Sequence, residues 1–331
     1  MNNSENNLPV DPIPWLLEAD DPSVRYLTLV TLLDRPASDP DVQAARAAIM
    51  SQGPVPTILA AQGPEGNWLE PGPGYTPKYQ SSVWQIIFLA QLGADLSDER
   101  VRLGCEYLLE HTQATNGGFS HNGRPGGAVH CLNGNLVHAL LALGYRDDPR
   151  IEAALHWQAR AISGEGFDRY YKSGTTGPGF CCSGNYGLPC AWGAIKALLG
   201  FSQVPLKDRD PVLQAAIDTS IDFLLSYNLH EADYPHQERI NGGWFKFGFP
   251  LGYTSDILQA LVVLAHFDRA DDPRLVEAIE FVRSKQDAQG RWKMEKSLNG
   301  KMWADIEQIR QPSKWVTLHA LYVLNKASGS S

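Results

Sequence analysis

Three of the five cysteines lie close together in the chain, and no other short stretch carries so many reactive side chains. Cys181 and Cys182 are adjacent, and Cys190 follows Pro189 directly before the apolar run 191–199. We expect a helix over that run with Pro189 in its first turn, which places Cys190 at the helix N-terminus. The helix dipole and the spare N–H groups there favour a thiolate, so the pKa of Cys190 should be low.

Two thiols on opposite sides of a substrate can supply and remove a proton. We expect Cys181 and Cys190 to form such a pair, with either thiol also able to add transiently to carbon. His130 is a further candidate acid or base, because imidazole titrates near neutral pH. Asp256 precedes another apolar run and is the fourth catalytic candidate, with a helix N-cap as its alternative role. Cys105 lies on a helical apolar stripe and is expected to be a buried side chain only.

The turns that carry these residues are rich in aromatic side chains and contain few polar groups. That composition is typical of a pocket for a small apolar ligand. Aromatic faces also stabilise positive charge in a reacting substrate, by about 1–2 kcal/mol per ring. The candidate substrate-binding residues are Tyr75, Tyr79, Cys131, Asn135, Asn185, Tyr186, Trp244, Phe247 and Tyr253.

A zinc site is an alternative use of the same thiols. His130, Cys131, Cys181 and Cys182 could meet across neighbouring turns as ligands of the ion. The chain contains no C-x-x-C pair, and two adjacent cysteines fit poorly around one ion. Zinc therefore remains the weaker alternative, and we expect no cofactor.

Two kinds of predicted helix alternate along the chain and must position these residues. Amphipathic helices follow an acidic cap with proline in the first turn at Asp148, Asp210 and Asp272, a repeat of 62 residues. Between them lie helices that are apolar on nearly all sides and must therefore be covered by other elements. These inner helices are predicted over Pro22–Leu33, Trp84–Leu92, Leu136–Leu143, Ala191–Leu199, Ile257–Ala265 and Val316–Leu324.

A glycine followed by an aromatic residue separates each outer helix from the next inner one. The glycine ends the outer helix, and the ring can fill the junction between the two helices. These turns are Gly66-Asn67-Trp68, Gly117-Gly118-Phe119, Gly166-Phe167, Gly242-Gly243-Trp244 and Gly290-Arg291-Trp292.

The two ends of the chain resemble each other, since Asp21-Pro22-Ser23-Val24 is similar to Gln311-Pro312-Ser313-Lys314. An open solenoid is the alternative fold, but its terminal repeats should carry polar caps, and both ends here are apolar. We therefore predict an all-α fold, a single α/α toroid with six inner and five to six outer helices in concentric rings. The inner helices then start at one rim, and the turns that lead into them form the mouth of a central cavity. Residues 1–12 and 327–331 are expected to be flexible ends of the toroid domain 13–326.

Composition narrows the classes of partner. The formal net charge is -9, and no basic run is present, which argues against nucleic acid. No stretch of about 18 uninterrupted apolar residues could span a bilayer, and the polar start lacks the features of a secretion signal. Five cysteines without the spacing of a small secreted domain indicate free thiols in a reducing cytoplasm. The oligomeric state stays open, including a homo-oligomer.

The glycine-aromatic turns and the alternating helices resemble the superfamily of terpenoid cyclases and protein prenyltransferases over nearly the whole chain. Within it, Cys181-x-x-x-Asn185-Tyr186-x-x-x-Cys190 is similar to the cysteine-pair segment of the linalool dehydratase-isomerase family. That resemblance implies metal-free dehydration and isomerisation of small terpene alcohols, with Cys181 and Cys190 as catalytic thiols and His130 as the family's histidine. The Asp-x-Asp-Asp motif of class II terpene cyclases and the Asp-x-Cys zinc motif of protein prenyltransferases are absent.

The sequence thus predicts a lyase or isomerase that uses a cysteine pair and a histidine on a small, largely apolar substrate of isoprenoid type. Dehydration, hydration and double-bond isomerisation all remain open. Two alternatives remain: a ligand-binding or scaffold toroid without activity, and a zinc-dependent enzyme of prenyltransferase type.

Overall fold

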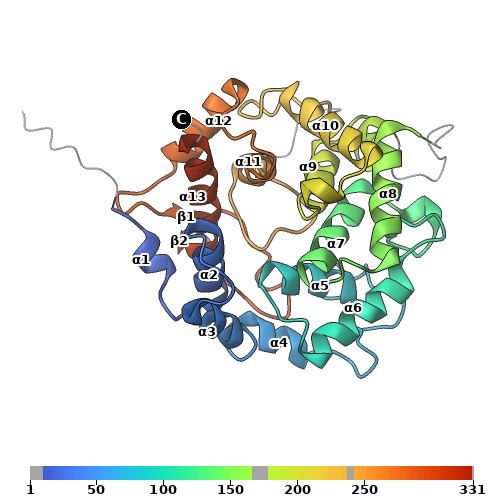
Figure 1. Ribbon diagram of the computed structural model, residues 1–331, viewed down its shortest axis with the longest axis horizontal. Coiled ribbons are helices and arrows are strands. Elements are labelled where there is room, and N and C mark those ends of the chain that lie inside the picture. Colours follow the sequence, from blue (N-terminus) through green and yellow to red (C-terminus); the bar gives the residue numbers. More distant parts are fainter. Residues whose placement is uncertain (1–9, 166–177, 237–241, 330–331) are drawn as a thin grey trace, which may run out of the picture.

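The structure, a computed structural model, describes residues 10–165, 178–236 and 242–329, which form a ring of helices (Figure 1). The predicted turn at Phe167 lies outside the described residues, as do residues 1–9 and 330–331 of the two expected flexible ends.

The helices longer than four residues are α2 (Pro22–Leu27), its π-helical continuation η1 (Thr28–Leu32), α3 (Pro40–Ile49), α4 (Pro54–Ala60), α5 (Ser82–Gln91), α6 (Glu99–Thr112), α7 (His130–Ala142), α8 (Pro149–Ser163), α9 (Ala191–Phe201), α10 (Pro211–Leu225), α11 (Ile257–His266), α12 (Val276–Ser284) and α13 (Lys314–Ser328). The shorter elements that the argument uses are α1 (Ile13–Leu16), η7 (Pro273–Leu275) and the antiparallel strands β1 (Trp292–Lys293) and β2 (Pro312–Ser313).

The inner ring consists of α2 with η1, then α5, α7, α9, α11 and α13 (Figure 1). These six segments coincide with the six apolar runs of the sequence. Every residue from Ser82 to Leu89 in α5 is buried, and in α11 only Val262 and His266 escape burial. Such helices need neighbours on all sides, and the second ring provides them.

The outer ring consists of α3, α4, α6, α8, α10 and α12, each packed against the inner ring. Aspartate side chains cap α3, α6, α8 and α10, while α4 follows Gly53. Asp148 accepts the amide of Arg150 at the start of α8, and Asp210 accepts that of Leu213 at the start of α10. Asp272 caps η7, the 3₁₀ turn that leads into α12. The prediction of a two-ring α/α toroid is confirmed.

Parallel inner helices approach most closely at α7 and α9, where glycines replace side chains. A Cβ on Gly134 would lie 2.0 Å from the carbonyl oxygen of Lys196, and a Cβ on Gly193 would lie 3.3 Å from Cβ of His130. The start of α7 contacts the start of α9, and residues further along α7 contact residues further along α9. The two helices therefore run in the same direction. Their N-termini therefore meet at one rim.

Tryptophan side chains fill several of the glycine-aromatic turns. The indole N–H of Trp68 donates to the carbonyl of Ile58 at 2.8 Å, and that of Trp292 donates to Val282 at 2.7 Å. Trp244 makes the same kind of bond to Leu229 at 2.9 Å and is fully buried. Trp244 was predicted to bind substrate, but it fixes a junction between helices instead.

The two ends of the chain meet and close the ring. The Lys314 ammonium at the start of α13 pairs with Glu18 at 2.9 Å and also with Asp20. Its Nζ lies 5.5 Å from the centre of the Trp15 ring, on α1. The helix α13 extends to Ser328, so order reaches two residues into the segment expected to be a flexible tail. An open solenoid would leave these ends apart.

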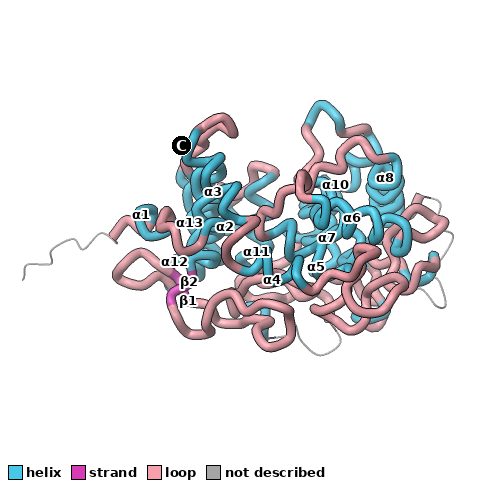
Figure 2. The backbone as a smooth tube through the Cα atoms, turned by 90° about the horizontal axis from the view of Figure 1, so that it is seen from below, coloured by secondary structure: helices cyan, strands magenta, loops and turns pink. Residues whose placement is uncertain are grey.

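Most of the long loops gather on one face of the ring (Figure 2). They lead into α5, α7, α11 and α13, so the rim where the inner helices start is a rim of loops. Among the described residues, none of the helices has the length and apolarity needed to cross a membrane.

Candidate functional site

The cysteine segment folds into a short hairpin. The amide of Cys182 donates to the carbonyl of Leu188 (3.2 Å), and the amide of Cys190 donates to that of Phe180 (3.0 Å). Successive side chains of an extended chain point to opposite faces. Cys182 and Cys190 therefore share one face of the hairpin, and Cys181 points to the other. The converging pair is thus Cys182 with Cys190, in place of the predicted pair of Cys181 with Cys190.

Three cysteines line a pocket of about 230 Å³ at the loop-rich rim, which we call the thiol pocket. Cys131 lies in the first turn of α7, Cys190 is the N-cap of α9, and Cys182 belongs to the hairpin. Cys181 does not line it. The other lining residues are His121, Val129, Ser183, Gly184, Asn185, Ala191, Trp192, Tyr234, Pro235, His236 and Tyr253.

A hydrogen bond between the side chains of Cys182 and Cys190 lets the two thiols share one proton. This bond, with the backbone N–H groups of Gly184 and Asn185, outweighs burial and lowers the pKa of Cys182 to about 6. The same bond, together with burial, raises the pKa of Cys190 well above its ordinary value. At neutral pH Cys182 is therefore the thiolate and Cys190 is its donor.

The helix behind Cys190 begins at Ala191, as its predicted range has it, but Pro189 does not lie in its first turn. Ala191 is the first residue of α9 and Cys190 its N-cap, so Pro189 precedes the helix. Cys190 does lie at the helix N-terminus, as predicted. Its pKa is nevertheless raised and not lowered, because it gives its hydrogen bond to Cys182 and is buried.

A second hydrogen-bonded group lines the thiol pocket, formed by Cys131 and Tyr253. Burial raises the pKa of Cys131 to about 11, although the hydrogen bond with Tyr253 opposes the shift. The charge of a Cys131 thiolate, followed by burial, raises the pKa of Tyr253. Tyr253 also bonds to Tyr75, whose pKa burial raises to about 12. All three groups therefore keep their protons at neutral pH.

The histidines that line the pocket are His121 and His236, not His130. His121 lines the thiol pocket, and its ring centre lies 5.7 Å from that of Tyr75. His130 is buried at the start of α7, with its ring centre 5.6 Å from that of Phe180 and 6.0 Å from that of Trp157. It does not line the pocket, so its predicted acid–base role finds no support.

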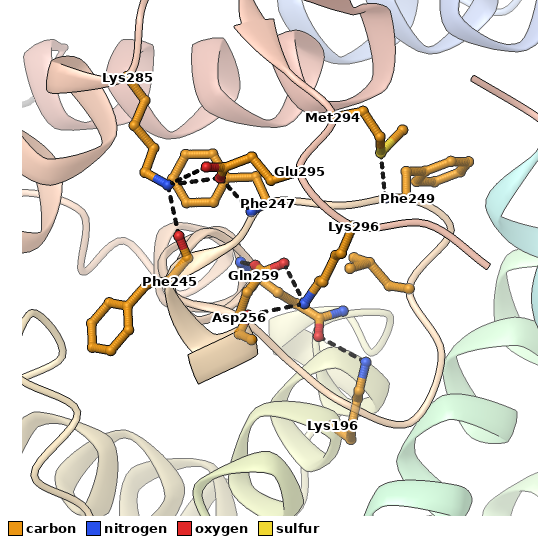
Figure 3. Close-up of polar contacts among 12 residues, drawn as sticks. Lys196, Phe245, Phe247, Phe249, Asp256, Gln259, Lys285, Met294, Glu295 and Lys296 are labelled. Carbon is orange, nitrogen blue, oxygen red and sulfur yellow. Dashed lines mark hydrogen bonds and ion pairs between the residues drawn. The ribbon is translucent and has the colours of Figure 1, made fainter. Parts of the chain in front are cut away.

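Asp256 serves as an N-cap and lies away from the thiols. Its side chain accepts the backbone N–H of Gln259 at 2.9 Å at the start of α11. It also pairs with the Lys296 ammonium at 3.0 Å (Figure 3). Asp256 lines a second cavity and not the thiol pocket. The helix N-cap, which was the alternative to a catalytic role, is therefore the role observed.

Two predicted asparagines hold the walls of the thiol pocket. The Asn185 amide donates to the carbonyls of Pro189 at 2.8 Å and Pro235 at 2.9 Å, which ties the hairpin to a neighbouring loop. The Asn135 amide donates to Gly252 at 3.2 Å and so fixes the residue before Tyr253. Asn185 lines the pocket, and Asn135 supports it from behind.

Three further predicted aromatic residues do not line the pocket. Tyr79 packs with its ring centre 5.0 Å from that of Trp84. Tyr186 is 70% exposed in the turn of the hairpin. Phe247 is fully buried beneath the Lys285 ammonium, which lies 4.6 Å from the ring centre.

Sequence reasoning missed Cys182 as a pocket thiol, and it missed other lining residues. A signal for Cys182 was present, because Gly184 and Gly187 favour a tight turn and a hairpin alternates its side chains. The residues without any such local signal are His121, Trp192, Tyr234 and His236.

No group of three or more His, Cys, Asp or Glu side chains within 10–165, 178–236 and 242–329 could hold a metal ion. His130, Cys131, Cys181 and Cys182 therefore do not form the zinc site considered above. Each of the five cysteines is a free thiol.

No protein-family model matches the chain, and no curated protein matches its sequence. The solved structures that match in fold include the type II terpene cyclase MstE from Scytonema in its apo form. The two chains share 13% sequence identity with a TM-score of 0.47, over 95% of this chain and 89% of that one. A similarity at this sequence identity and TM-score gives no information about activity. The assignment of the toroid fold depends on the helix contacts described above.

Proposed function

We propose that the protein is a lyase or isomerase that transfers protons on a small, largely apolar substrate bound in the thiol pocket. The observation that carries the proposal is the hydrogen-bonded pair of Cys182 and Cys190 on the wall of this pocket. One member accepts a proton at neutral pH while its partner keeps one. A packing role alone would leave both thiols protonated.

The groups around the pocket have complementary roles in a dehydration. The Cys131–Tyr253 group gives a proton to the hydroxyl of the substrate, which leaves as water. The Cys182 thiolate takes a proton from the adjacent carbon, and the electron pair of that C–H bond forms the alkene. Isomerisation uses the same groups, since one proton is removed at Cys182 and one returned to another carbon.

The size of the pocket sets the size of the substrate. An engineered cavity of about 150 Å³ holds benzene, so the thiol pocket of about 230 Å³ would hold roughly ten non-hydrogen atoms. Trp192 and Tyr234 give it apolar walls, and among the described residues no Lys or Arg side chain lines it to bind a phosphate. Terpenoid alcohols of that size are the first class to test, because the cysteine segment resembles that of the linalool dehydratase-isomerase family.

Alkylation by iodoacetamide tests the thiol pair, because only the thiolate reacts. We expect Cys182 to be labelled first, at a rate that rises with pH and reaches half its maximum near pH 6, where Cys182 loses its proton. Mass spectrometry of peptides from partly labelled protein identifies the site. Cys182→Ser should remove the fast phase and reduce turnover of the terpenoid alcohol by about 10³-fold.

Cys181→Ser is the matched control, since it changes the adjacent cysteine on the other face of the hairpin. It should keep both the fast phase and the turnover. Fast labelling that persists in Cys182→Ser, or full turnover in that variant, would contradict the proposal. A protein with a fast thiol but no turnover of any terpenoid alcohol would be the ligand-binding toroid.

A further inference from the structure

A second cavity, of about 310 Å³, lies on the axis of the ring, and we call it the axial cavity. Every inner helix contributes to its wall. One apolar residue from each is Leu27, Ala90, Ala142, Leu199, Val262 and Leu318.

The axial cavity opens at the rim opposite the thiol pocket. Thr31, Ala142 and His266 line it, are exposed, and lie at the C-terminal ends of η1, α7 and α11. Of the described residues, none lines both cavities. A ligand in one cavity therefore leaves the other accessible.

Polar groups at the inner end of the axial cavity compensate one another (Figure 3). The Lys196 ammonium is fully buried and donates to the side-chain oxygen of Gln259 at 2.7 Å. Asp256 pairs with Lys296 at 3.0 Å. Gln259 and Asp256 both line the cavity, whereas neither lysine does. The end wall thus offers an amide and an already neutralised carboxylate.

Two imidazoles belong to the wall of the axial cavity. No hydrogen bond from another described residue reaches the ring of His138 on α7 or of His319 on α13, and both rings line the cavity. Burial lowers the pKa of His138 to about 3 and that of His319 to about 4, so both are neutral at pH 7. A neutral imidazole carries one donor and one acceptor nitrogen, and both rings are half-buried where they line the cavity, so a ligand there can meet these groups.

We propose that the axial cavity is a second ligand site, whose ligand is an uncharged aliphatic alcohol of roughly twelve non-hydrogen atoms. The size follows from the volume of about 310 Å³, twice that of a cavity that holds benzene. A hydroxyl is both donor and acceptor, so it can bond to one acceptor nitrogen and one donor nitrogen of these imidazoles. A carboxylate would find no Lys or Arg among the described residues of the wall, and an ammonium would find a carboxylate already paired with Lys296. This site does not depend on the function proposed for the thiols.

Calorimetric titration with three probes of equal chain length tests the head group that the cavity accepts. We expect 1-octanol to bind the wild-type protein at pH 7 at least about tenfold more tightly than octanoate or octylammonium, because burial of an unpaired charge is costly. Tighter binding of either ion, or no heat from 1-octanol up to its solubility limit, would overturn the proposal.

Variants at the open end locate the site. Ala142→Trp fills the mouth from an exposed position and should raise the Kd of 1-octanol by about tenfold or more without loss of helix content. Gln203→Trp, in the turn that follows α9, blocks the same cavity from another part of the chain and guards against a local defect in α7. Unchanged affinity in both variants would place the alcohol elsewhere.

Protein alkylated at Cys182 with iodoacetamide separates the two cavities. Alkylation of Cys182 fills the thiol pocket and should change the Kd of 1-octanol by less than about twofold. Loss of 1-octanol binding after alkylation would mean that the alcohol occupies the thiol pocket, which would refute the axial site and leave the proposed lyase or isomerase function standing.

Discussion

At the scale of single residues, the chemistry of the thiol pocket depends on which of two adjacent cysteines faces it. The hairpin turns Cys182 toward Cys190 and toward the N–H groups of Gly184 and Asn185, all of which favour its thiolate. Cys181 makes none of these contacts, and burial raises its pKa. Two residues with the same side chain thus differ in charge at neutral pH because of their orientation alone.

Tyr253→Phe tests the proton-donating group of the pocket. The change removes the hydroxyl that bonds to Cys131 and Tyr75 and keeps the ring that lines the wall. If Tyr253 passes a proton to the leaving group, kcat should fall by about 10²-fold or more with a smaller change in KM. The alkylation rate of Cys182 should stay within about twofold, since its own partners are unchanged.

The control for this variant is Tyr186→Phe, which alters a tyrosine that is 70% exposed in the hairpin turn. We expect it to keep kcat and KM. Equal losses in the two variants would mean that Tyr253 supports the fold and not the chemistry.

The sequence located part of the site. Cys131, Cys190, Asn185 and Tyr253 lie at or shortly before the starts of inner helices, and these starts meet at one rim in any toroid, so their presence in the pocket was predictable. His130 also lies at the start of an inner helix, but its ring packs near Trp157 and Phe180. Side-chain direction within a turn depends on backbone pairing and on packing partners distant in sequence, which spacing alone does not reveal.

At the scale of elements, glycines decide how closely two inner helices approach. The carbonyl oxygen of Lys196 occupies the space next to Gly134, and Gly200 packs against the backbone of Gly134 from the same side. This contact brings the N-termini of α7 and α9 together, and with them Cys131 and Cys190. The geometry of the thiol pocket is therefore set by a backbone contact several residues below it.

Gly134→Ala should push α7 and α9 apart, because its Cβ would lie 2.0 Å from backbone that has no freedom to rotate away. Overpacking of this kind costs about 3 kcal/mol, and the higher helix propensity of alanine recovers only about 1 kcal/mol. We expect urea denaturation to show a loss of about 2 kcal/mol in the free energy of unfolding.

Gly193→Ala is the matched control at the same interface. Its Cβ would lie 3.3 Å from Cβ of His130, a contact that a small shift relieves. The gain in helix propensity should then balance the strain, and the free energy of unfolding should change by less than about 1 kcal/mol. A larger loss in Gly193→Ala than in Gly134→Ala would contradict this account of the helix contact.

The helices themselves were largely predictable from local signals. An aspartate followed by proline marks the start of α3, α8 and α10, and the apolar runs mark the inner ring. The hairpin of residues 180–190 was not predictable in the same way, because its register depends on hydrogen bonds that leave no periodic pattern. Caps and periodicity are local properties, and register is not.

At the scale of the whole molecule, the ring is held shut by contacts between its ends. Trp15 on α1 lies between two cations, with its ring 5.5 Å from Nζ of Lys314 and 5.3 Å from the guanidinium carbon of Arg291. Lys314 also pairs with Glu18 and Asp20. An inner helix in a closed ring has two inner neighbours, whereas the ends of a solenoid have one. Closure should therefore make unfolding a single event.

Trp15→Ala tests this cooperativity. The side chain is half-buried against the main core and stacks on both cations, so its loss should lower the free energy of unfolding by about 2 kcal/mol. Leu206→Ala, at a position 75% exposed and away from the closure, should leave it unchanged. In a closed ring the lower free energy of unfolding affects all helices together. Circular dichroism and tryptophan fluorescence should therefore report one shared midpoint, shifted to lower urea concentration. Two separate transitions in Trp15→Ala, with one at the wild-type midpoint, would mean that the ends fray independently and that the ring behaves as an open stack of helix pairs.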